Sequence, residues 1–278
     1  MRKLARYVFL ENEYIGVHVG LISVNGSLLL VDAPLLVDEA REWLEVISRK
    51  GRPRYLAFLD NHPDRVLGAI NYDIPIIAQN ATMEKMRGWS DTFKGGAHPI
   101  GADADQLKRI VGVQKVVPDL TFSGEISIFL NELELTFLHR PGPQDGSMWI
   151  VIPSVKTIFI GDFVTVSQPP YFGAADTDRW LQGLDELRSS PLATYKIISS
   201  RDGPVERADI NDMARFLRKI PPRLKDLTGG ENDEVVARKH ASSLLKSFPV
   251  PAVYNDIAHT RLTSSFLDLH SRQIDLVK

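Results

Sequence analysis

The 278-residue sequence contains no cysteine. This absence excludes disulfides, thiolate zinc sites and cysteine nucleophiles. Any metal ion bound by this chain must therefore be held by histidine and carboxylate side chains, and only 7 histidines are present.

Long hydrophobic runs and an excess of one charge are also lacking. The chain has 33 Lys and Arg against 35 Asp and Glu, and the basic residues are scattered along it. This distribution predicts neither a nucleic-acid groove nor a basic membrane-binding surface. Residues 1–16 make a poor signal peptide, and no apolar stretch has the length of a membrane span. The sequence therefore predicts a cytoplasmic protein that binds no nucleic acid and no membrane.

Several short apolar segments end in aspartate. Predicted strands at 27–31, 54–59, 157–160 and 195–200 are followed by four acids, which are Asp32, Asp60, Asp162 and, after a short turn, Asp202. If these strands are neighbours that run the same way, the acids converge on one rim, where α/β-type proteins usually bind ligands. Aspartate is also common after strands simply because it caps turns and helix starts.

Helical and strand-like periodicities alternate along the chain. Apolar spacing predicts helices at 37–47, 66–69, 82–87, 102–110 and 177–187, and strands at 14–24, 126–130, 133–138 and 148–152. Everything after about residue 209 is predicted to be helical. We therefore expect one domain at 1–208 with a helical C-terminal extension at 209–278 packed on it. Leucines of this extension can pack on the domain or on a second subunit, so a homo-oligomer formed through the C-terminal helices stays open.

The segment from Asp60 to Arg65 concentrates side chains that can bind metal ions. Asp60 and His62 are two residues apart and can reach the same ion, and Asp64 follows. Imidazole combined with carboxylates suits Zn, Mn or Fe. The sequence therefore places a candidate metal site at the end of the strand at 54–59.

Four segments in order resemble the motifs of the metallo-β-lactamase superfamily. The segment 59–68 is similar to T-H-x-H-x-D-H-x-x-G, and 139–147 to H-x-P-G-H-T-x-G-S. Gly161-Asp162 resembles the family's G-D, and 200–204 its G-H-G-P. The resemblance covers about residues 10–205 and implies a four-layer αββα sandwich.

The departures from these motifs fall on the metal ligands. The resemblance keeps His62, Asp64 and Asp162 and replaces the family's other four histidines by Asp60, Arg65, Pro143 and Asp202. It implies that a first metal loses a ligand at Pro143, for which the nearby His139 is a partial substitute. A second metal would keep Asp64 and Asp202 but would face Arg65. The metal ligands implied by the resemblance are Asp60, His62, Asp64, Asp162 and Asp202, with Arg65, Pro143 and His139 lining the site.

Arg65 opposes a second ion. A guanidinium stays protonated, and at about 4 Å from a divalent ion it would repel the ion by roughly 8 kcal/mol at an effective dielectric constant of 20. We expect Arg65 to donate instead to Asp64, Asp162 or Asp202. The sequence therefore predicts at most one divalent metal ion, with Mn, Fe, Mg or Zn as candidates.

Two functions remain open from the sequence. The first, implied by the resemblance, is a metal-dependent hydrolase of esters, thioesters or phosphoesters, in which Asp64 orients or deprotonates a water molecule. The alternative is a non-catalytic binding or scaffold protein whose rim is an arginine–carboxylate network. Fold alone does not decide between them, and the sequence identifies no small-molecule substrate or ligand.

Overall fold

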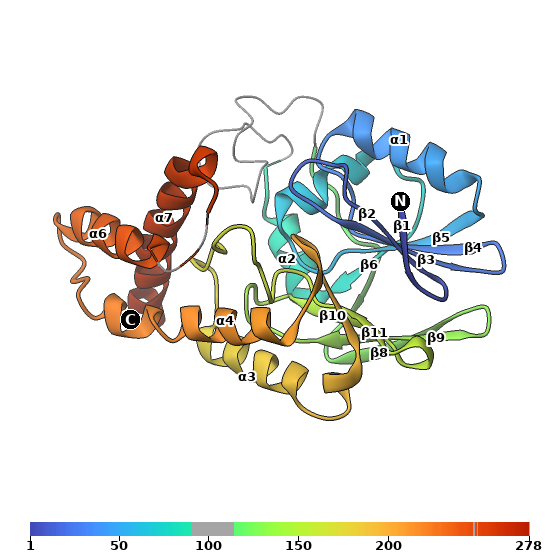
Figure 1. Ribbon diagram of the computed structural model, residues 1–278. Coiled ribbons are helices and arrows are strands. Elements are labelled where there is room, and N and C mark those ends of the chain that lie inside the picture. Colours follow the sequence, from blue (N-terminus) through green and yellow to red (C-terminus); the bar gives the residue numbers. More distant parts are fainter. Residues whose placement is uncertain (91–113, 247, 249, 278) are drawn as a thin grey trace.

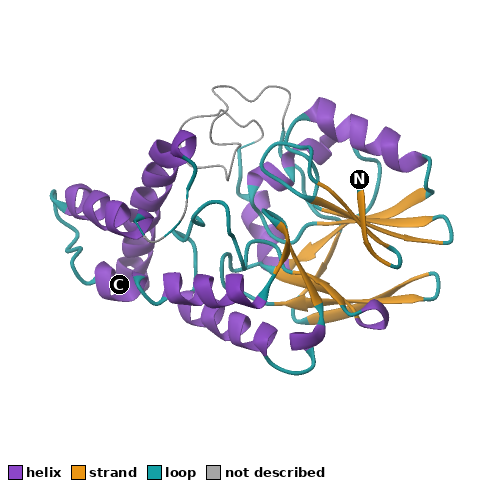
Figure 2. Cartoon of the chain, in the orientation of Figure 1, coloured by secondary structure: helices purple, strands orange, loops and turns teal. Residues whose placement is uncertain are grey.

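Two β-sheets face each other in the computed structural model, which describes residues 1–90, 114–246, 248 and 250–277. Helices lie on the outer side of each sheet (Figures 1 and 2). The chain is therefore an αββα sandwich with further helices at its C-terminal end, as the sequence predicts.

The first sheet contains seven strands in the order of the chain. β1 to β4 form an antiparallel meander, and β4 to β7 run parallel. Asn25 and Gly26 join β3 and β4 with φ of 46° and 78°, the conformation that a two-residue hairpin requires. The strands are β1 (Arg2–Ala5), β2 (Val8–Glu11), β3 (Val19–Val24), β4 (Ser27–Val31), β5 (Arg52–Ala57), β6 (Ile76–Gln79) and β7 (Leu120–Phe122).

The second sheet has six strands in the order β13-β12-β11-β10-β9-β8. Only β11 and β12 are parallel neighbours; the other pairs are antiparallel. The strands are β8 (Glu125–Leu130), β9 (Leu133–His139), β10 (Met148–Ile152), β11 (Thr157–Phe159), β12 (Lys196–Ser199) and β13 (Gly203–Val205). Both sheets are thus mixed.

Helices make the two outer layers of the sandwich. α1 (Val37–Ser48) and α2 (Asn80–Arg87) accompany the first sheet, and α3 (Thr177–Arg188) and α4 (Arg207–Leu217) cover the second (Figure 1). The chain ends in α5 (Ile220–Leu224), α6 (Asp233–Leu245) and α7 (Asn255–Val277). Within the described residues, no helix combines the length and hydrophobicity needed to span a membrane.

Three clusters of buried apolar side chains hold these layers together. One lies between the sheets and includes Leu29, Phe137 and Ile150. A second joins the first sheet to α1 through the fully buried Trp43. The third extends from the second sheet across α3 and α4 to α7, where Phe266 packs edge-on against Phe172 with ring centroids 5.1 Å apart. The C-terminal helices therefore share a core with the second sheet.

Some element boundaries differ from the sequence-based expectation. The helix predicted to start at 66–69 is a short 3-10 helix, η2 (Leu67–Asn71), and another, η1 (Pro63–Arg65), precedes it. A Cβ at Gly68 would lie 2.0 Å from the carbonyl oxygen of Pro34, so the backbone packs there too closely for any larger side chain. The first strand predicted at 14–24 begins only at Val19. The helix predicted at 102–110 lies outside the described residues.

Candidate functional site

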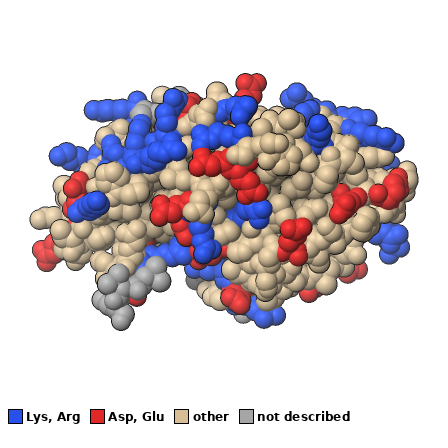
Figure 3. All heavy atoms as spheres, turned by 90° about the horizontal axis from the view of Figure 1, so that it is seen from below, with Lys and Arg blue, Asp and Glu red and all other residues tan. Residues whose placement is uncertain are grey.

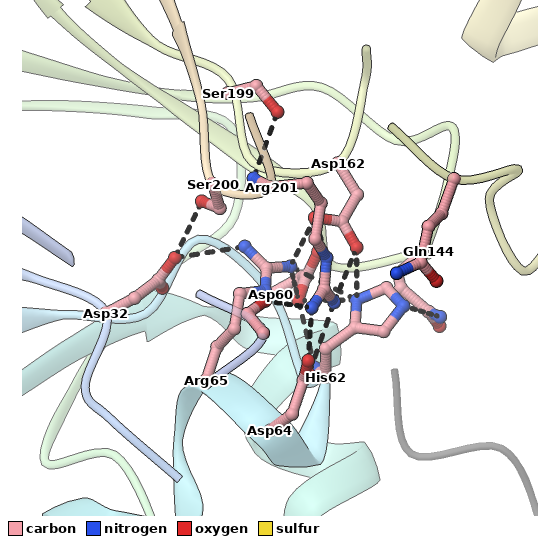
Figure 4. Close-up of polar contacts among 12 residues, drawn as sticks. Asp32, Asp60, His62, Asp64, Arg65, Gln144, Asp162, Ser199, Ser200 and Arg201 are labelled. Carbon is pink, nitrogen blue, oxygen red and sulfur yellow. Dashed lines mark hydrogen bonds and ion pairs between the residues drawn. The ribbon is translucent and has the colours of Figure 1, made fainter. Parts of the chain in front are cut away.

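The ends of strands from both sheets meet at one rim of the sandwich (Figure 4). β4 leads into Asp32, β5 into Asp60, β11 into Asp162 and β12 into Arg201. The backbone turns sharply at two of these ends, because Asp32 has φ of 58° and Gly161 has φ of 61°. Such left-handed conformations suit glycine and are tolerated by aspartate. The local sequence therefore directs the carboxylates of Asp32 and Asp162 into the rim.

Asp60, His62 and Asp162 form the tightest group of potential ligands. One ligand atom from each lies within 4.8 Å of the other two, and all three side chains are buried. The Nδ1 atom of His62 lies 2.9 Å from Oδ1 of Asp60 and 3.4 Å from Oδ2 of Asp162. This group has the composition and the spacing of a site for one metal ion.

Arg65 is fully buried beneath this group. Its Nη1 atom donates to Oδ2 of Asp32 over 3.0 Å, and its Nη2 atom contacts Oδ1 of Asp60 and lies 3.6 Å from Oδ1 of Asp162. Arg65 therefore pairs with rim carboxylates as expected, but mainly with Asp32 and Asp60. Of the three expected partners, Asp64, Asp162 and Asp202, the ion pairs of Arg65 include Asp162. Asp32 receives two further hydrogen bonds, from the backbone N–H of Leu59 at 3.0 Å and from the hydroxyl of Ser200 at 2.8 Å.

A second arginine, Arg201, enters the rim from the opposite sheet. Its Nε and Nη2 atoms donate to the two oxygens of Asp162 over 3.0 and 2.9 Å. The same guanidinium pairs with Asp64, with Nη2 3.2 Å from Oδ1 and a closer contact through Nη1. Nη1 also donates to the carbonyl oxygen of Gly16 over 2.8 Å. Arg201 therefore cross-links the ends of β5 and β11 to the loop between β2 and β3.

At this strand end the sequence motif pointed to Asp202, the residue after Arg201, as the side chain that enters the rim. Asp202 was expected in the rim, and this expectation is wrong. Its carboxylate accepts hydrogen bonds from the backbone N–H groups of Val166 and Ser167 over 2.8 and 2.9 Å. Consecutive side chains point in different directions at this strand end, so when Arg201 faces the rim, Asp202 faces the following loop.

The turn at 139–147 brings no second histidine to the rim. His139 directs Nε2 to the carbonyl oxygen of Asp145, 2.8 Å away, and so braces its own turn. Pro143 is buried and offers no ligand atom. The next residue, Gln144, reaches the site instead, with Nε2 3.5 Å from Nε2 of His62.

Burial and neighbouring charges shift the pKa values of several side chains in the rim. Burial alone would raise the pKa of Asp60, but Arg65 and His62 outweigh burial and hold this pKa well below its ordinary value. Burial is likewise outweighed at Asp162, whose pKa is lowered by Arg201 and Arg65. Asp32 differs, because its burial exceeds the effect of Arg65 and raises its pKa. The pKa of Arg201 is raised by Asp162 and Asp64 despite burial.

His62 lies between these charges. Burial lowers the pKa of His62, but Asp60 and Asp162 outweigh it and the net shift is upward. Its Nδ1 atom lies 2.9 Å from Asp60 and 3.1 Å from Nη2 of Arg65. Arginine cannot accept a hydrogen bond, so a protonated Nδ1 donates to Asp60. Binding of an ion at Nδ1 therefore requires loss of this proton.

With all four aspartates ionised, both arginines protonated and His62 neutral, the rim carries two net negative charges, and the raised pKa values of Asp32 and His62 act to reduce this excess. The Oδ2 atom of Asp60 is buried and has no hydrogen-bond partner in the described part of the chain. A buried carboxylate oxygen without a partner is costly. Both features fit one added cation beside Asp60.

A pocket of about 110 Å³ opens beside this group. Its wall includes His62, Asp162 and Arg201 on one side and Thr165, Gln168 and Arg261 on the other. A volume of this size holds several water molecules or a compact ligand. Acidic and basic side chains occur together on the face of the molecule that Figure 3 shows.

Comparison with known proteins agrees with this architecture. A metallo-β-lactamase from Pontibacter korlensis is 15% identical, with a TM-score of 0.59, and the match covers 78% of this chain and 97% of that one. The DIM-1 metallo-β-lactamase is 15% identical, with a TM-score of 0.60 and coverage of 78% and 95%. TMB-1 is 17% identical, with a TM-score of 0.59 and coverage of 78% and 96%. No protein-family model matches the sequence, and no curated protein matches it.

The fold is thus an αββα sandwich. More narrowly, the chain has the metallo-β-lactamase fold, as its four sequence motifs suggest. The matches span nearly all of each similar structure and leave about a fifth of this chain outside. Because identity is low, the likeness establishes the fold and leaves the chemistry to the site.

Proposed function

We propose that this chain is a metallo-hydrolase-like protein with a degenerate site that holds at most one divalent ion, on Asp60, His62 and Asp162. The observation that carries this proposal is the pairing of Arg201 with both Asp64 and Asp162. The resemblance assigns Asp64 to the second metal and makes Asp162 a ligand shared by both metals. A guanidinium therefore takes the position where the second ion would be needed.

Nη2 of Arg65 contacts Oδ1 of Asp60 and lies 3.1 Å from Nδ1 of His62 and 3.6 Å from Oδ1 of Asp162, so an ion can enter only if this guanidinium moves aside. Three features then favour an ion at the first position. Its donors are close together, its charges leave a negative excess, and Oδ2 of Asp60 has no partner among the described residues. An oxygen-rich donor set favours Mn, Fe or Mg more than zinc sites rich in histidine do. When bound, the ion would supply Lewis acidity to a water molecule or an ester or phosphoester oxygen.

The second position does not fit an ion. Asp64 is fully buried and held by Arg201, Asp202 faces away, and Arg65 takes the place of a histidine. The same contacts bear on catalysis. Asp64 can act as a general base only if Arg201 releases its carboxylate. Hydrolysis of generic esters and phosphodiesters should therefore be near background.

A second candidate function is a non-catalytic binding or scaffold protein. It is favoured by the contacts of Asp32, Asp60, Asp64 and Asp162, each of which already pairs with at least one guanidinium. In this alternative the network holds the rim together without an ion, and the pocket beside it binds a ligand without reaction.

Titration calorimetry distinguishes the two candidate functions. Protein without a histidine tag is stripped with EDTA, dialysed and titrated with Mn²⁺ and with Zn²⁺. One equivalent should bind to the wild type and be lost in His62→Gln, whereas the matched control His259→Gln, at a half-buried residue that contacts Ser242, should bind like the wild type. Two tightly bound equivalents would refute the proposal, and no binding would favour the scaffold function.

A further inference from the structure

Polar side chains on one face of α7 contact an irregular loop that borders the rim. Arg261, Ser265, Asp268 and Arg272 are spaced by 4, 3 and 4 residues, so they lie along one side of the helix. Each contacts the segment 168–174, which leads away from Asp162 without regular secondary structure. Helix and loop thus run beside each other over about three helical turns.

The contacts satisfy the polar backbone of that loop. The backbone N–H of Phe172 donates to the hydroxyl of Ser265 over 3.1 Å. Arg261 donates to the side chain of Gln168 over 2.8 Å and to the carbonyl oxygen of Pro169 over 3.3 Å. A loop without a sheet or helix ladder needs such partners wherever it is buried.

Asp268 and Arg272 make further contacts from α7. The hydroxyl of Tyr171 donates to Oδ2 of Asp268 over 2.7 Å. Arg272 pairs with the carbonyl oxygen of Ala174 and donates to both oxygens of Asp145, over 2.8 and 2.7 Å. Asp145 belongs to the turn that carries Gln144. One helix therefore holds both loops that border the candidate metal group.

The same loop forms a wall of the pocket. Thr165, Ser167, Gln168 and Tyr171 line it, and Arg261 of α7 lines it as well, opposite His62 and Asp162.

We propose that α7 is a positioning element of the site. Ser265, Asp268 and Arg272 fix the 163–175 loop over Asp162 and His62, and Arg261 contributes directly to the pocket wall. The C-terminal helices are then part of the functional unit. The link to an ion rests on the proposed function; the link between helix and loop does not.

Amide hydrogen exchange on the full-length, metal-free protein tests the link between helix and loop. Asp268→Ala should raise exchange at least tenfold over residues 164–172, and Ser265→Ala should do so at the amide of Phe172. Asp268→Asn keeps an acceptor for Tyr171 and should stay close to the wild type. The control is Glu234→Ala, which removes an exposed ion pair on α6 and should change nothing in this loop. Unchanged exchange, or an increase spread equally through β3 and β10, would overturn the proposal.

Water-proton relaxation of bound Mn²⁺ tests the consequence for the site. Opening of the wall in Asp268→Ala should raise the relaxivity of the protein-bound ion while its affinity changes less than threefold. Locally faster exchange with unchanged relaxivity would show that α7 holds the loop without controlling access, against the proposal. If the wild type binds no Mn²⁺, the proposed function fails, and the exchange experiment alone still decides whether α7 positions the loop.

Discussion

Arg201 and Asp64 lie 137 positions apart in the sequence, and in the folded chain the guanidinium of one contacts both oxygens of the other. The side chain of Arg201 is 7% exposed and that of Asp64 is fully buried. Because Arg201 also donates to both oxygens of Asp162, a single side chain joins the two sheets at their common rim.

Loss of Arg201 should destabilise the metal-free protein strongly. Arg201→Ala leaves Asp64 and Asp162 buried with fewer compensating charges, which costs about 3–5 kcal/mol for a broken buried pair. Urea unfolding in EDTA measures the loss, and Mn²⁺ should restore part of it. The matched control is Arg215→Ala, whose partner Asp212 is exposed; its effect should stay below about 1 kcal/mol. Equal effects of the two variants would contradict the role of Arg201.

Two of the four aspartates that the sequence offered as ligands should behave differently. Asp60→Asn removes a charged donor from the metal group, and we expect Mn²⁺ affinity to fall at least tenfold. Asp202→Asn should change it less than threefold, because Asp202 binds the backbone of Val166 and Ser167. Calorimetric titration of both variants, with circular dichroism as the folding check, gives the comparison. A larger loss in Asp202→Asn would place that carboxylate at the ion after all.

The C-terminal helices should unfold together with the sandwich. We propose that residues 209–278 form an extension that packs on a domain at 1–208 through the shared apolar cluster. Phe266→Ala should therefore lower the unfolding free energy of the whole chain by about 3–5 kcal/mol, whereas Val253→Ala, at a position 72% exposed, should change it by less than about 0.5 kcal/mol. Unfolding followed by both tryptophan fluorescence and far-ultraviolet circular dichroism should give one transition. Two separate transitions in the wild type would argue against this coupling.

Asp233 gives a prediction for acid stability. Its carboxylate accepts hydrogen bonds from the backbone N–H groups of Thr228 and Gly229 over 3.0 and 2.8 Å, and these bonds, first that from Thr228, lower its pKa below the ordinary 3.8. A lowered folded-state pKa stabilises the fold above the ordinary value, and this stabilisation is lost as pH falls through the folded pKa. Asp233→Asn should therefore be less stable than the wild type at pH 6, and the difference should shrink below pH 4. A difference that persists unchanged at pH 2 would contradict the ionic origin.

Much of the fold is visible in the sequence because periodicity reports burial. The hairpin at Asn25-Gly26, the helix at 177–187 and the apolar strands ending in Asp32, Asp60 and Asp162 all correspond to elements of the structure. The pairing of Arg65 with rim carboxylates was also predictable, because the family motif places this arginine at a metal-ligand position among several acids. The short strands β1 and β13 have too few residues for a clear pattern.

The site itself was harder to predict where a shift of one position in the sequence changes which side chain faces the rim. In Ser200-Arg201-Asp202 the motif favoured the aspartate, since it can bind metal, but which of two neighbours faces the rim depends on the turn after β12. Gln144 and Arg261 were missed for another reason. Gln144 reaches His62 through the conformation of a tight turn, and Arg261 reaches the pocket through the packing of a helix about 100 residues from Asp162. No local sequence pattern predicts either contact.

The two buried guanidiniums of the rim also determine when its strand ends become cross-linked. A metal ion is collected from outside, so its occupancy follows the free ion concentration and can be reversed by a chelator. Arg65 and Arg201 are synthesised with the chain, one of each per molecule, and cannot diffuse away. The cross-links that they make between strand ends therefore form as soon as the chain has folded, in every molecule, and are independent of metal supply.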